Sequence, residues 1–111
     1  MWVYDMTNDS KKILYALYKE YDQRRKNGLS RMNSKYFSSA KDIQQNFFSE
    51  WLLTDVEDCL RELSREKYLD NLYGDNTITE CFISEHAIEK MENQVKETFL
   101  SVADFISKFI P

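Results

Sequence analysis

At 111 residues the chain has room for one domain with a modest core, since a chain of this size hides roughly 65% of its extended-chain surface on folding. Hydrophobic residues make up 42% of it and aromatic residues 14%, which excludes a disordered chain despite 31% charged residues. The net charge of −4 is uneven: residues 1–50 carry nine Lys or Arg against six Asp or Glu, and residues 51–111 carry six against thirteen, so the two halves suit different partners.

The first predicted helix covers residues 8–26. Thr7 or Asn8 can cap its start, and Gly28 marks its end. Apolar residues recur at helical spacing and should form one buried face, comprising Ile13, Leu14, Leu17, Tyr18 and Tyr21.

A polar loop, a short strand and a second helix follow. The stretch "SKYFSS" is aromatic and bounded by serines, which is compatible with a brief strand. Ser39 then opens "SAKDIQQNFF", with Asp42 at the third helical position of a capping box. Ala40, Ile43 and Phe47 lie on one face of this short helix.

The third predicted helix is "TDVEDCLRELSREK", in which Thr54 and Glu57 have the spacing of a second capping box. Its buried stripe should comprise Val56, Cys59, Leu60 and Leu63. Its water-facing side should then comprise Asp55, Asp58, Arg61, Glu62 and Arg65.

A hairpin is predicted in "NLYGDNTITECFIS". Gly74, Asp75 and Asn76 tolerate positive φ and suit a tight turn between two extended segments. The alternation of apolar and polar residues is imperfect, because Glu80 would point to the same face of the strand as Ile78 and Phe82. One face of this hairpin should therefore be only partly covered.

A long amphipathic helix is predicted from Ser84, its cap, almost to the end of the chain. This divides the chain into a tail (1–7), a core (8–84) and a C-terminal helix (85–111). The apolar stripe of this helix continues beyond the two or three turns that a small core needs, so its last part must be covered by something else. A second copy of the chain, in a homodimer, would cover it. Folding back on the first helix would also cover it, as would docking on another protein or on a membrane surface. The polar face of this helix lacks the Lys and Arg residues that would attract anionic lipids, so no membrane partner is expected. The residues predicted for the dimer are Met91, Val95, Phe99, Val102, Phe105, Ile106 and Phe109.

The order of helix, strand, two helices, hairpin and helix resembles the winged helix-turn-helix, a mainly α fold with a small β-hairpin. The segment "SSAKDIQQNFFSEWLLTDVEDCLRELSREKYLD" is similar to its central helix pair, and "NLYGDNTITECFIS" to its wing. The ending "FLSVADFISKFIP" resembles the small YjcQ-like proteins of Firmicutes and their phages, whose function is undefined.

That resemblance implies a DNA-binding, transcriptional-regulator-like protein, of phage or mobile-element type. The third helix would enter the major groove and the wing at Asp75 to Thr77 would approach the backbone. Cations of the first half would hold phosphates, although solvated surface charge and helical ion pairs explain the same residues. The predicted nucleic-acid ligands are Arg24, Arg25, Lys26, Arg31, Lys35, Lys41, Gln45, Thr54, Arg61, Arg65 and Asn76.

Acidity favours a different function. The sequence pI is near 5.0, and Asp55, Asp58 and Glu62 on the third helix would repel phosphate. The alternative is therefore a winged-helix protein-interaction module that grips a basic partner or imitates nucleic acid, without binding DNA.

Residues for catalysis or for metal binding are not evident in the sequence. His86 is the sole histidine, and there is neither a GxSxG motif nor a glycine-rich phosphate loop. Cys59 and Cys81 lack CxxC spacing and should be buried, reduced thiols. We therefore expect a protein that is not an enzyme and has no metal or other cofactor. We expect it in the cytoplasm, because no secretory signal or membrane-spanning run is visible.

Overall fold

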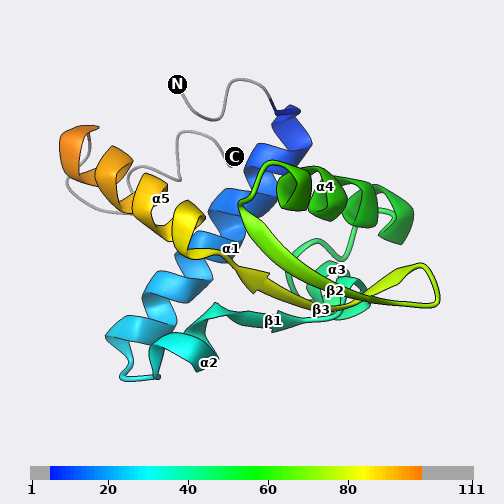
Figure 1. Ribbon diagram of the computed structural model, residues 1–111, viewed down its shortest axis with the longest axis horizontal. Helices are drawn as coiled ribbons and strands as arrows, with labels where there is room; N and C mark the ends of the chain where they lie inside the picture. Colours follow the sequence, from blue (N-terminus) through cyan, green and yellow to red (C-terminus); the bar gives the residue numbers. More distant parts are fainter. Residues whose placement is uncertain (1–5, 99–111) are drawn as a thin grey trace.

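The computed structural model describes residues 6–98, with side chains as far as residue 93. It is mainly helical with a small antiparallel sheet, so the predicted α+β class is confirmed (Figure 1). The elements in chain order are α1 (Asn8–Lys26), α2 (Arg31–Lys35), β1 (Tyr36–Ser38), α3 (Ala40–Phe47), α4 (Leu53–Arg65), β2 (Leu69–Gly74), β3 (Thr77–Ile83) and α5 (Glu85–Thr98).

The helices enclose one side of a sheet with strand order β1-β3-β2. In Figure 1 the sheet lies in front of α3, and α4 runs along the side of β2. The core lies between the sheet and the helices, and every predicted apolar residue of α1 and of α4 is buried in it. From α5 the core receives Ala87, Ile88 and Met91.

The hairpin turn consists of Asp75 and Asn76, whose φ angles are 52° and 64°. Two consecutive residues with positive φ form the type I′ turn that matches the twist of the flanking strands. Gly74 is the last residue of β2 and keeps an ordinary φ, unlike the prediction that placed it in the turn. A side chain there would press on the neighbouring strand, because an added Cβ would lie 3.1 Å from Thr79 Cγ2.

A β-bulge explains the broken alternation of the hairpin. Leu72 pairs with Glu80 but Tyr73 pairs with Ile78, so Thr79 is an extra residue on β3. The extra residue reverses the faces of the strand at that point. Ile78 and Cys81 therefore both point into the core although they are three positions apart.

Three of the predicted helix caps are confirmed. Thr7, Ser39 and Ser84 accept hydrogen bonds from the backbone N–H groups three residues later, at 3.2, 3.1 and 3.0 Å. Asp42 does not return the bond to Ser39; its carboxylate accepts one from the Ser38 hydroxyl at 2.6 Å.

The predicted cap at Thr54 is wrong. Helix α4 begins at Leu53, and its N-cap is Leu52, which makes no side-chain hydrogen bond. The preceding turn sets this start: Gln44 Nε2 donates to the carbonyl oxygens of Ser49 and Trp51, and the Trp51 ring packs on Phe48. Helix α2 was likewise predicted as loop; Ser30 caps it.

Helix α5 is described as far as Thr98, so the predicted extension of this helix and the N-terminal tail fall largely outside the described residues. Met91, predicted for a dimer interface, is fully buried in the core of its own subunit. The other dimer predictions lie outside the described side chains and stay predictions; they are Val95, Phe99, Val102, Phe105, Ile106 and Phe109. Within residues 6–98 there is no helix whose length and apolar character would let it cross a membrane.

Candidate functional site

Arg24, a predicted phosphate ligand, is an internal connector. Its guanidinium donates to the carbonyl oxygen of Tyr36 at 2.7 Å and to that of Ser34 at 3.3 Å, and its Nε pairs with Glu20 at 2.9 Å. The guanidinium carbon also lies 4.6 Å from the centre of the Phe37 ring. Arg24 therefore ties the end of α1 to β1.

Neighbouring cations are also engaged. Lys26 pairs with Asp22 at 2.9 Å, and Arg25 donates to the carbonyl oxygen of Leu29 at 3.0 Å. Both of these residues remain exposed to solvent at the end of α1. Their contacts are local, so a phosphate could compete for them.

Glu85, at the first position of α5, gathers the cations of α2. It pairs with Lys35 at 2.9 Å and makes a two-bonded contact with Arg31. The hydrogen bonds from Lys35 and then from Arg31 hold the pKa of this carboxyl below its ordinary value. Two predicted phosphate ligands thus share one carboxylate that is distant in the sequence, which offsets one of their two positive charges.

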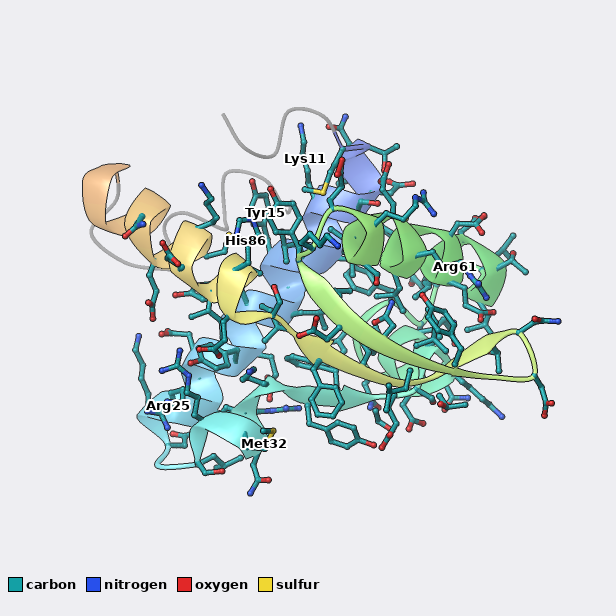
Figure 2. The ribbon with its side chains drawn as sticks, viewed as in Figure 1. Lys11, Tyr15, Arg25, Met32, Arg61 and His86 are labelled. Carbon is teal, nitrogen blue, oxygen red and sulfur yellow. The ribbon has the colours of Figure 1, made fainter. Side chains whose placement is uncertain are left out.

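Arg61 and Asn76, both predicted DNA contacts, bind each other. Arg61 donates to the carbonyl oxygen of Asn76 at 2.6 Å, and its guanidinium carbon lies 5.5 Å from the centre of the Tyr73 ring. Glu57, one turn earlier on α4, pairs with Arg61 at 3.7 Å and accepts a hydrogen bond from Thr77 Oγ1 at 2.8 Å. These contacts, the wing latch, fasten the hairpin tip to α4, and Figure 2 shows Arg61 between the two.

The remaining predicted ligands are free of such contacts. Lys41, Gln45 and Thr54 are exposed and make no ion pair or side-chain hydrogen bond within the described part of the chain. Arg65 is exposed near Glu62 and helps to lower its pKa. Figure 2 places Arg25 and Arg61 at opposite ends of the view, so these two predicted ligands lie far apart.

The outward side of α4 is acidic. Asp55 and Asp58 are exposed, and with Asp9 and Glu62 they line a groove of about 320 Å³ between α4 and the start of α1. Partial burial alone would raise the pKa of Glu62, but hydrogen bonds from Ser10 and Thr7 lower it overall. The acidity of α4 was predicted from the sequence. The groove was not, because the contact between Thr7 and Glu62 that closes it joins residues more than fifty positions apart.

The histidine and the two cysteines have structural surroundings. The His86 ring stacks on Tyr68 with 5.2 Å between ring centres. Cys59 and Cys81 are buried, free thiols, as predicted; burial raises the pKa of both, that of Cys81 to about 12, which suppresses the reactive thiolate. Among the described residues no three His, Cys, Asp or Glu side chains are arranged to hold a metal ion.

Comparison with family models, with curated proteins and with solved structures finds no match for this chain.

Proposed function

We propose that this chain is a winged-helix module that binds another protein through the acidic outward side of α4. The winged-helix assignment rests on the order α1, β1, α3, α4, β2, β3 and on the type I′ hairpin that follows α4. In that architecture α4 stands in the place of the helix that enters the DNA major groove.

One observation carries the choice of protein over DNA: six of the eight cations expected to hold phosphate have carboxylate or carbonyl partners inside the molecule, and Lys41 and Arg65 are the two without such a partner among the described residues. Arg31 and Lys35 share Glu85, and Arg61 is held by Glu57 and Asn76. Binding a phosphate would break these contacts, and little counterion release would be left to drive association. Asp55 and Asp58 would meanwhile face the duplex.

The same surface suits a basic protein segment. Unlike charges across an interface steer association and exclude partners of the wrong sign. Leu52 is 69% exposed and Leu53 37% exposed at the start of α4, so apolar contact is available next to the carboxylates. Protein-binding surfaces combine an apolar centre with a polar rim, and the two leucines beside the carboxylates offer both kinds of contact.

DNA binding is the second candidate, favoured by the arrangement of α4 and the hairpin. Lys41 and Arg65 are exposed cations, and Arg25 and Lys26 have only local partners. If a duplex displaced the wing latch, Arg61 would join them.

Titration of labelled duplex DNA, followed by fluorescence anisotropy at low and moderate salt, separates the two functions. We expect no saturable binding of DNA even at low salt, and salt-sensitive binding of a lysine-rich peptide. Replacing both Asp55 and Asp58 by Asn should weaken peptide binding, whereas Glu50→Gln, in the turn before α4, should not. Binding of DNA that falls steeply with salt, and that charge reversal of the exposed residues Arg25 and Lys26 abolishes, would instead establish the DNA-binding function.

A further inference from the structure

A groove follows the free edge of the sheet. Strand β2 is an edge strand, because the order is β1-β3-β2. The groove has a volume of about 440 Å³ and is lined by every residue of 69–72, with Ser64 and Lys67 on the side of α4. Successive residues of a strand point to opposite faces, so a groove that touches all four must run along the strand edge.

Next to this edge is a sheet face that no described helix covers, the outer sheet face, formed by Tyr36, Asp70, Leu72, Glu80 and Phe82. The register aligns Tyr36, Phe82 and Asp70 in one row and Leu72 with Glu80 in the next. Leu72 is 53% exposed and Tyr36 37% exposed. The described helices lie behind the sheet or beside it in Figure 1, and no described helix crosses in front of this face.

The free edge of β2 lacks several of the usual protections against strand pairing. Proteins blunt exposed edges with proline, with charged residues such as lysine, with a bulge on the edge strand or with a covering helix. Strand β2 has the sequence LDNLYG, whose one charged residue is Asp70, and the extra residue of the bulge is Thr79 on β3. Helix α4 approaches β2 where Asn71 Nδ2 donates to the Leu60 carbonyl oxygen at 3.1 Å, and the groove along residues 69–72 leaves room beside this edge for another strand.

We propose that β2 binds an extended segment of a partner protein, which joins the sheet as a fourth strand. On the outer sheet face the added strand would place a Lys or Arg beside Asp70 and, two residues away, an apolar side chain beside Leu72. Main-chain hydrogen bonds supply affinity in this mode of recognition, and alternate side chains supply specificity. The proposal goes beyond the proposed function, since it uses a different surface from the acidic side of α4.

The charges on the outer sheet face favour a basic strand of another protein over nucleic acid and over a second copy of β2. Asp70 and Glu80 make no ion pair within the described residues, so nucleic acid would meet two uncompensated carboxylates. Antiparallel pairing of two copies of β2, centred on Asn71, would set each Asp70 opposite Leu72 of the other copy and leave the carboxylate without a cation. A basic segment of a different protein satisfies both the carboxylate and the apolar residue.

The test uses the full chain, labelled with ¹⁵N, and a peptide in which Thr alternates with Lys and Leu. The Asp55→Asn/Asp58→Asn background removes the competing charge on α4. We expect amide shifts in residues 69–74 and slower hydrogen exchange along that edge. Asp70→Lys should weaken binding about tenfold or more, while the matched reversal Glu50→Lys should not. The same peptide methylated at alternate backbone nitrogens should not bind, because it cannot pair as a strand.

Several outcomes would overturn the strand-addition proposal: shifts absent from residues 69–74, equal binding of the methylated peptide, or equal losses in Asp70→Lys and Glu50→Lys. Concentration-dependent association of two copies through β2, seen by sedimentation, would also overturn it. Failure here leaves the proposed function intact if lysine-rich peptide binding still depends on Asp55 and Asp58. Loss of that dependence, with edge binding retained, would refute the proposed function alone.

Discussion

At the scale of single residues, the caps predicted at Ser39 and Thr54 can be compared directly, because the structure confirms the first and not the second. Ser39 accepts a hydrogen bond from the Asp42 N–H, whereas Thr54 lies inside α4 and makes none. We predict that Ser39→Ala lowers the free energy of unfolding by about 1 kcal/mol, because the N–H loses its acceptor. Thr54→Ala should change it by less than about 0.5 kcal/mol. Urea unfolding of both variants measures this; equal losses would contradict the assigned start of α4.

The same pair shows what local spacing can predict. Both segments have a hydroxyl residue followed three positions later by an acidic residue, and the pattern identifies the cap correctly at Ser39. At Thr54 it fails because the N-cap is Leu52, two residues earlier, after the turn in which Gln44 donates to the Trp51 carbonyl oxygen. Contacts of that kind are not visible in the spacing. The internal roles of Arg24 and Arg31 are invisible for the same reason, since their partners lie in other elements.

At the scale of elements, the wing latch joins α4 to the hairpin. We predict that Arg61→Ala speeds hydrogen exchange of the amides in 73–78 by roughly tenfold, because a hydrogen bond from a charged donor contributes about 1.5 kcal/mol. Exchange in the core of α1 should not change, since the ion pair, hydrogen bond and ring contact of Arg61 are with Glu57, Asn76 and Tyr73. Arg65→Ala is the control, since Arg65 is exposed and has no contact with the wing. Equal exchange in the two variants would show that the turn holds the wing without the latch.

Element identities followed from periodicity, but the register of the sheet did not. Apolar spacing predicted α1, α3 and the stripe of α4, because burial of one face dominates helix packing. The anomalous parity of Glu80 pointed to irregularity in the hairpin. Only the pairing of strands shows that Thr79 is the extra residue, and hence that Glu80 points outward. The outer sheet face, which pairs Leu72 with Glu80, depends on that register and could not be predicted.

At the scale of the whole molecule, the sequence predicted the charge imbalance without its arrangement. Cations of the first half were expected to form one basic zone. In the fold, Glu85 from the second half lies against Arg31 and Lys35 and neutralises part of that zone. On α4, Glu57 pairs with Arg61, but Asp55 and Asp58 are exposed and make no ion pair among the described residues. Long-range pairing thus reduces the positive charge that α2 presents, while the outward side of α4 keeps the acidity of its sequence.

Acid sensitivity follows from two of these long-range contacts. The pKa values of Glu62 and Glu85 are lowered in the folded state from an ordinary value of 4.5. A lowered folded pKa means that stabilisation is fully present above about pH 4.5 and is lost as pH falls through the folded value. We therefore predict that Glu62→Gln and Glu85→Gln destabilise the protein near neutral pH and converge with the wild type in acid. Glu66→Gln, at an exposed position after α4, should track the wild type throughout. Urea unfolding across pH 2 to 7 measures the free energy of unfolding of each variant. If the loss of this free energy in Glu62→Gln stays the same in acid, the Ser10 and Thr7 contacts do not depend on the charge of the carboxylate.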